Sequence, residues 1–352
     1  MLDRALSVQI ARLASGGDPQ ERLPGDLEAW AERAKAEVGR FTGLASGDAL
    51  PDPEPVAREE WSEVNVAMLD EILAPVTARL DERVAAAGPF AGPLRAVTGA
   101  TLAAEVGLVV GYLARRVLGQ YELSLLGHER PPRLLIVSSN VTGAAREMEV
   151  DGESFLAWIV LHEVTHAFQF AGVPWLREHL GGLLERYLAT VEVRIQRGTA
   201  GGLPSLPDPA TLVEAFREGG LAALVQTREQ RAIIDQVQAA MAVVEGYSEH
   251  VMDALGAEVV PAYEGLREAM ERRRANRSAP ERVLMRLLGF DLKMRQYELG
   301  RRFCSEVAER AGMAGLNRVW ESAGALPTLA ELEAPEVWLA RVERAAALDA
   351  PA

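Results

Sequence analysis

Apolar residues recur at three- and four-residue spacing through most of this 352-residue chain, in long segments rich in Ala, Leu, Glu and Arg. This spacing places apolar side chains on one face of an α-helix, so it predicts a predominantly helical protein. One helical tract is expected from about residue 57 to residue 87. The short β-branched run RLLIVSSNV at 133–141 follows two prolines and predicts a strand. We therefore expect an α+β fold in which long helices accompany a small sheet.

The composition limits the classes of function that remain open. Hydrophobic residues make up 49% and charged residues 25% of the chain, which is typical of a globular protein with a sizeable core. The net charge of −14 disfavours binding to a nucleic-acid backbone. Cys304 is the only cysteine, and the longest apolar run, 106–114, is too short to cross a bilayer and predicts a buried helix. We expect a cytoplasmic protein that binds neither nucleic acid nor membrane, and its oligomeric state stays open.

An H-E-x-x-H motif, made of His162, Glu163 and His166, lies within DGESFLAWIVLHEVTHAFQF, which predicts a helix over about 151–172. Residues four apart share a helix face, so both imidazoles can bind one Zn²⁺, and Glu163 can take a proton from a zinc-bound water. With five histidines in the chain, a chance match is expected about 0.01 times. The alternative is that both histidines are core residues with ordinary hydrogen-bond partners.

A catalytic zinc needs a third protein ligand. The residues after His166 lack the third histidine of the metzincin spacing. Glu245, in AMAVVEGYSEHVMDALG on a helix expected over about 228–255, is the better candidate. Glu249 follows four residues later on the same face and is expected to orient a ligand imidazole, because zinc-bound histidines usually donate their second N–H to a carboxylate or carbonyl. The alternative is an exposed acidic stripe.

These segments carry a resemblance to a known family. HEVTHAFQF followed by PWLRE, together with VEGYSEHVMD, resembles the bacterial zincin-like metallopeptidase type 2 family, whose members are also labelled hydrolases or associated with deazaflavin-coenzyme biosynthesis. The likeness extends over VLGQYEL, DLKMRQYELGRRF and LNRVWESAGALPTLAELEAPEVWLARV. The resemblance implies a zincin-like fold and a gluzincin-type metalloprotease site: His162, His166 and Glu245 as ligands of one Zn²⁺, and Glu163 as base. The family commonly has Asp at the position of Glu249.

Further site residues are expected around this centre. A donor must stabilise the developing oxyanion, and Arg295 and Tyr297, which lie within the family resemblance, are the first candidates. Tyr247 and His250, beside Glu245, and Asn140, in the predicted strand, are assigned to substrate binding. In zincins generally, the strand near the motif helix aligns the substrate chain by β-addition, and 133–141 is the segment suited to that role.

The function expected from these observations is that of a zinc-dependent metallohydrolase, specifically a peptidase acting on a peptide or protein. The alternative is a non-catalytic helical binding or scaffold protein that keeps a relic or structural metal site. A ferritin-like di-iron protein would need a second Glu-x-x-His, which the chain lacks. For domain organisation, we expect an N-terminal helical arm over 1–55 and a catalytic unit over 56–352.

Overall fold

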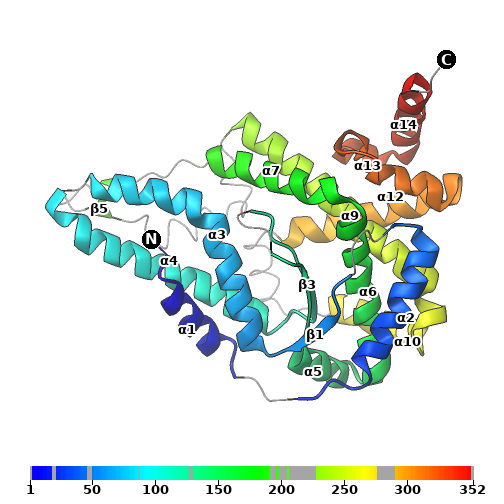
Figure 1. Ribbon diagram of the computed structural model, residues 1–352, viewed down its shortest axis with the longest axis horizontal. Coiled ribbons are helices and arrows are strands. Elements are labelled where there is room, and N and C mark those ends of the chain that lie inside the picture. Colours follow the sequence, from blue (N-terminus) through cyan, green and yellow to red (C-terminus); the bar gives the residue numbers. More distant parts are fainter. Residues whose placement is uncertain are drawn as a thin grey trace. The chain divides into compact units, whose positions relative to one another are not determined.

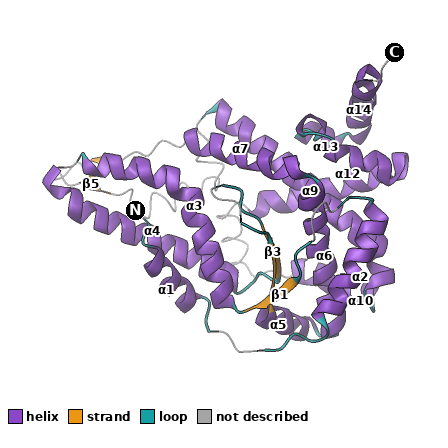
Figure 2. Ribbon diagram, in the orientation of Figure 1, coloured by secondary structure: helices purple, strands orange, loops and turns teal. Residues whose placement is uncertain are grey.

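The computed structural model describes residues 2–17, 21–45, 50–86, 88–126, 130–190, 196–197, 204–205, 227–275 and 290–349, and it describes side chains outside 196–197, 204–205, 274–275, 290–297 and 349. Helices dominate these residues (Figure 2). The chain forms two compact units: unit 1 contains 1–27, 52–156 and 185–214, and unit 2 contains 28–51, 157–184 and 215–352. Each unit thus takes part of the expected arm over 1–55, whose separate folding stays a prediction.

Unit 1 combines helices with a small sheet (Figure 1). Its elements are α1 (Arg4–Ala14), β1 (Pro53–Val56), α3 (Arg58–Ala85), the 3-10 turn η1 (Gly88–Phe90), α4 (Ala91–Ala114), β2 (Gly119–Glu122), β3 (Arg133–Val137), α5 (Ser138–Met148), and the two-residue strands β4 (Gln196–Arg197) and β5 (Pro204–Ser205). The helix expected over 57–87 is therefore α3.

The sheet of unit 1 has the strand order β1-β3-β2. β3 pairs parallel with β1 and antiparallel with β2, and Leu134–Val137 are fully buried. Strands buried on both faces read as continuous apolar runs, which explains the sequence of β3. β1 is an edge strand with prolines at 53 and 55, positions that suit an edge because proline has no N–H to donate.

The strand predicted over 133–141 is too long. It ends at Val137, and α5 begins at Ser138. Ser138, Ser139 and Asn140 interrupt the apolar run, and their side chains compete with the backbone for hydrogen bonds, which disfavours continuation of the strand. The role predicted for this strand in β-addition is also wrong for β3, because both of its edges are already paired with β1 and β2.

Helix α4 packs against α1 and α3 in the core of unit 1. A Cβ on Gly107 would lie 2.6 Å from the carbonyl oxygen of Ser7, so α1 and α4 approach closely where a side chain is absent. Val106 and Val110 are in this core, whereas Leu108 is exposed. Among the described residues, Gly88–Ala114 is long and apolar enough to cross a membrane by length and composition, a test that core helices also pass.

Unit 2 is built from helices. They are α2 (Leu27–Thr42), most of α6 (Gly152–Gly172), the first part of α7 (Pro174–Thr190), α9 (Arg228–Val259), α10 (Tyr263–Ala275), α12 (Phe290–Leu316), the turns η3 (Asn317–Trp320) and η4 (Ala323–Ala325), α13 (Leu329–Glu333) and α14 (Pro335–Asp349). α9 begins with a capping box, in which Thr227 and Gln230 bond to each other's backbone amides.

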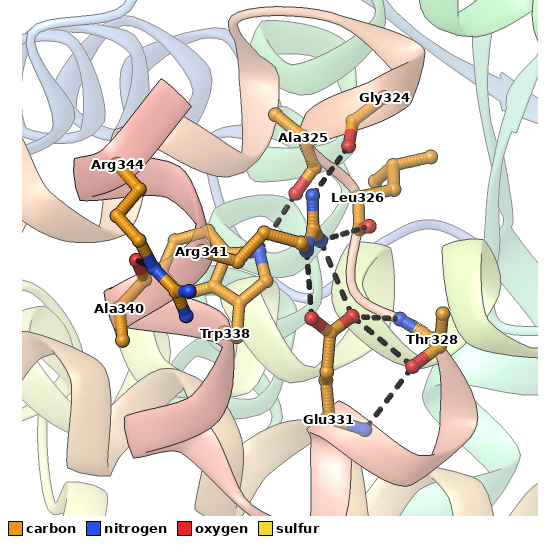
Figure 3. A network of polar contacts seen from close by, with 9 residues as sticks. All are labelled: Gly324, Ala325, Leu326, Thr328, Glu331, Trp338, Ala340, Arg341 and Arg344. Atoms are coloured by element: carbon orange, nitrogen blue, oxygen red, sulfur yellow. Dashed lines mark hydrogen bonds and ion pairs between the residues drawn. The ribbon is translucent and has the colours of Figure 1, made fainter. Parts of the chain in front are cut away.

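The C-terminal helices of unit 2 are joined by a polar network (Figure 3). Arg341 on α14 donates from Nε to Glu331 Oε1 at 2.7 Å, and from its other nitrogens to the carbonyls of Gly324 and Leu326. The Glu331 carboxylate also accepts from the amide and hydroxyl of Thr328. One arginine thus ties α14 to α13 and to the loop that precedes it.

The predominantly helical α+β class predicted from the sequence is confirmed. The motif helix expected over about 151–172 is α6, and the third-ligand helix expected over about 228–255 is α9. Along the chain, β3 leads through α5 into α6, so one short helix separates the small sheet from the motif helix.

Candidate metal centre

Helix α6 has a polar start and an apolar body. The Asp151 carboxylate accepts hydrogen bonds from the backbone amide and hydroxyl of Ser154, which lower the pKa of Asp151. The residues from Phe155 to Leu161 are all buried. This apolar sequence keeps the helix embedded over its middle turns, so the polar side chains that follow at 162–166 lie in a mostly buried setting.

The two histidines of the motif face each other across one helical turn. Nε2 of His162 lies 3.2 Å from Nε2 of His166, with the rings in an edge-on arrangement. The indole of Trp158 stacks parallel to the His162 ring at a centroid distance of 5.8 Å. Because residues four apart share a helix face, the motif spacing produces this convergence directly.

Glu245 on α9 completes the cluster. Its Oε2 lies 3.6 Å from Nε2 of His166. One donor atom from each of His162, His166 and Glu245 lies within 4.8 Å of the others. The structure therefore brings together the three residues that the sequence analysis assigns as metal ligands, from two helices of unit 2.

The chemistry of this donor set fits zinc. Two nitrogens bound at 2.0–2.1 Å to a tetrahedral Zn²⁺ are about 3.4 Å apart, close to the separation of the two imidazole Nε2 atoms. Two imidazoles and one carboxylate are a common ligand set of catalytic zinc, and none of these side chains is more than partly exposed. The residues present therefore suit a zinc ion held by His162, His166 and Glu245.

The electrostatics of the cluster favour positive charge. Burial disfavours a protonated His166, but hydrogen bonding to Glu245 and the charges of Glu245 and Glu163 outweigh it and raise the pKa of His166 to about 9. Glu163 is 8% exposed, so two carboxylates act on one buried imidazole. A metal cation that binds His166 would displace the proton from this imidazole.

Two contacts at the centre were not anticipated from the sequence. Gln169 Oε1 lies 2.8 Å from His166 Nδ1, and Ser248 Oγ lies 3.2 Å from His162 Nδ1. Gln169 is three residues after His166 on the same helix face, a spacing that signals contact. Glu249 is partly buried. Its predicted role, to orient a ligand imidazole, stays a prediction.

Other predicted site residues lie in different surroundings. Tyr247 is fully buried, and its hydroxyl donates to Asn317 Oδ1 at 2.8 Å, which is the environment of a core residue rather than of a substrate contact. Burial lowers the pKa of His250, whose ring lies 6.2 Å from that of Phe41. Side chains at Arg295 and Tyr297 lie outside the described residues.

Asn140 belongs to unit 1 and has a structural role there. Its Nδ2 donates to the carbonyls of Ala114 at 2.7 Å and Val117 at 2.6 Å, and its Oδ1 accepts from Arg58 Nε at 2.7 Å. These bonds satisfy the carbonyl at the end of α4 and leave Asn140 only 5% exposed. They do not support the substrate-binding role predicted for Asn140.

Comparison with known proteins identifies a family and a similar solved structure. The chain is similar to a solved structure from Chloroflexus aurantiacus described as "a putative hydrolase with a novel fold", with 28% identity, a TM-score of 0.70, and coverage of 98% of this chain and 99% of that chain. No match is found among curated proteins. The family model described as zincin-like metallopeptidase matches residues 3–339. Because that match covers nearly the whole chain, including all three candidate metal ligands, the protein belongs to the zincin-like metallopeptidase family.

Proposed function

We propose that this protein is a zinc-dependent hydrolase that cleaves peptide bonds, with His162, His166 and Glu245 as zinc ligands and Glu163 as general base. The observation that carries the proposal is the convergence of three donor side chains within 4.8 Å, with Glu163 directly beside one of them in the motif. Among the described residues, this group has three members, the number of protein ligands typical of a catalytic rather than a structural zinc site.

The roles of the chain's own residues follow from this arrangement. A zinc ion held there would polarise a substrate carbonyl and lower the pKa of a water molecule. Glu163 accepts a proton from the attacking water at its carboxylate and passes it to the leaving amine. Glu163 is 8% exposed, so its proton transfer is shielded from bulk solvent. Arg295 and Tyr297 stay the proposed donors to the developing oxyanion.

The first test is metal content. Plasma mass spectrometry of protein purified without chelator or nickel is expected to find about one zinc per chain, lost in His162→Ala and Glu245→Ala. His179→Ala is the matched control, because His179 packs against Trp175 on α7 and is not part of the cluster. The proposed site would be contradicted if only the His179→Ala control lost zinc, or if the wild-type protein bound no zinc.

The second test separates catalysis from metal binding. Glu163→Gln is expected to keep zinc and to lose peptide hydrolysis, measured by mass spectrometry on a peptide library, because an amide cannot accept the proton. Glu178→Gln, an exposed position on α7, is the control and is expected to keep both properties. Wild-type rates in Glu163→Gln would show that Glu163 is not the base. Zinc binding without hydrolysis of any peptide would favour a structural metal site.

A further inference from the structure

Gln169 is a fully buried amide that touches both helices of the metal centre. Its Oε1 lies 2.8 Å from Nδ1 of His166 on α6, and its Nε2 donates to the carbonyl oxygen of Val244 on α9 at 2.7 Å. Val244 directly precedes Glu245 in the chain. A single side chain therefore joins one candidate metal ligand to the backbone beside another.

The second bond fixes the direction of the first. A backbone carbonyl can only accept, so the NH₂ group of Gln169 must face Val244 and its oxygen must face His166. An amide oxygen can only accept as well, so Nδ1 of His166 carries the proton and donates it. The lone pair of neutral His166 is then on Nε2, the atom that faces His162 and Glu245.

A comparable contact holds the other histidine. Nδ1 of His162 lies 3.2 Å from Oγ of Ser248, a fully buried residue on α9 three positions after Glu245. Both imidazoles are therefore held by the turn of α9 from Val244 to Ser248. Ser248, which contacts His162, lies on this turn, and Gln169, which contacts His166, bonds to its Val244 carbonyl. That turn also carries Glu245, so it determines the position of all three candidate ligands.

We propose that Gln169 is a positioning residue of the metal centre, which fixes His166 in the tautomer that binds metal through Nε2 and sets the spacing between His166 and Glu245. Ser248 holds the ring of His162 in place through its hydroxyl. This inference rests on the proposed zinc site and adds to it the residues that orient the ligands. Removing a group that orients a ligand histidine usually reduces metal affinity 10–100-fold.

The test compares variants of the full-length protein for binding of Zn²⁺ and Co²⁺. Gln169→Met keeps the length of the side chain and removes both hydrogen bonds. Gln169→Glu keeps the acceptor for His166 Nδ1 and removes the donor to Val244. The matched control is Gln230→Met, because Gln230 is also buried and hydrogen-bonded on α9, but lies 15 residues before Glu245, about 22 Å along the helix.

Two readouts are measured beside the urea unfolding of the metal-free proteins. The zinc dissociation constant, from competition with a chromophoric chelator, is expected to rise 10–100-fold in Gln169→Met and to stay unchanged in Gln230→Met. The visible spectrum of bound Co²⁺, which reports ligand geometry, is expected to change in Gln169→Met and to be restored only in part in Gln169→Glu, which keeps the bond to His166 but lacks the bond to Val244. A merely structural loss of stability would not move this spectrum.

The outcomes separate this inference from the proposed function. Wild-type zinc affinity and cobalt spectrum in Gln169→Met, or an equal loss of affinity in Gln230→Met, overturn the role of Gln169 while the zinc site stands. A wild-type protein that binds neither metal overturns both. If Gln169→Met does not fold, Gln169→Ala, which also removes both hydrogen bonds, decides: a raised zinc dissociation constant supports the role of Gln169, and an unchanged one overturns it.

Discussion

Gly246 and Gly300 meet where α9 crosses α12, and a Cβ on Gly246 would lie 2.1 Å from the carbonyl carbon of Gly300. A Cβ on Gly300 would lie 1.9 Å from the carbonyl oxygen of Ala242. The two helix backbones therefore touch one residue after Glu245. Because both positions lack a side chain, α12 can pack directly against the turn of α9 that carries Glu245, the third candidate ligand.

This contact predicts a large effect from one methyl group. Gly300→Ala is expected to lower the free energy of unfolding by about 3 kcal/mol or more, because the clash is with backbone and a helix must shift to relieve it. It is also expected to weaken zinc binding, since the shift moves Glu245. Urea denaturation and zinc competition measure the two effects.

Gly182→Ala is the control for that substitution. Gly182 lies inside α7, and a Cβ there would meet no atom within 4 Å. Because alanine favours the helical conformation more than glycine does, the free energy of unfolding of this variant is expected to rise by about 0.5–1 kcal/mol. Equal behaviour of the two variants would contradict the close packing of α9 against α12.

The raised pKa of His166 predicts a pH dependence of metal binding. Zinc needs the neutral imidazole, and in the metal-free protein His166 has a pKa of about 9. Zinc affinity is therefore expected to fall by about tenfold for each pH unit below 9 and to level off above it. Zinc titrations from pH 6.5 to 9.5 measure the slope, and a flat profile over this range would contradict the shift.

The stability of the metal-free protein should follow the opposite trend. The folded-state pKa of His166 lies above the ordinary histidine value of 6.5, so folding favours the protonated form. That contribution is complete below about pH 6.5 and is lost as pH rises through 9. Urea unfolding at pH 6 and pH 9.5 is expected to show the loss in the wild type. Glu245→Gln, which removes the carboxylate that raises this pKa, should show a smaller one.

The network around Arg341 predicts a local loss of stability. Burial alone would raise the pKa of Glu331, but bonds from Arg341 and Thr328 lower it. Arg341→Met leaves this carboxylate without its charged donor, so the pKa of Glu331 should rise. The free energy of unfolding should fall by about 2 kcal/mol. Arg344→Met is the control, because Arg344 Nε donates to the Ala340 carbonyl on α14 and takes no part in the Glu331 contacts drawn in Figure 3. Thermal unfolding of both variants checks the difference.

Asn140 offers a test between a structural and a substrate-binding role. Asn140→Ala removes the donor to the Ala114 and Val117 carbonyls and is expected to cost about 1–3 kcal/mol of unfolding free energy while zinc content stays unchanged. Thr142→Ala, which removes a hydroxyl bonded to the Ser138 carbonyl within α5, should cost less. A raised KM with unchanged stability would instead support contact with substrate.

The sequence predicted the helices of the centre well because each has strong local signals. Asp151 and Gly172 mark the ends of α6, and Thr227 with Gln230 caps α9. The motif spacing alone brings His162 and His166 together. Glu245 was predicted from its acidic helix face and again from the family resemblance, because no local pattern alone shows which helix packs against α6.

Some features could not be predicted from the sequence because they depend on which face of a helix packs against which neighbouring element. Tyr247 and Glu245 are two residues apart, so they point to different sides of α9, and only the packing shows that the tyrosine faces the core. The end of β3 was missed because Val141 continues the β-branched pattern past the start of α5. Gln169 was missed because its second partner is a backbone carbonyl on another helix.

The prolines of β1 have a consequence for how the protein avoids self-association. Leu134–Val137 of β3 form a fully buried apolar run, the kind of segment that aggregates when another chain adds to its sheet. β1 covers one side of it, and Pro53 and Pro55 remove two N–H donors from that edge strand. An edge without those donors is a poor template for a further strand, so these two prolines also hinder pairing of the sheet with another chain.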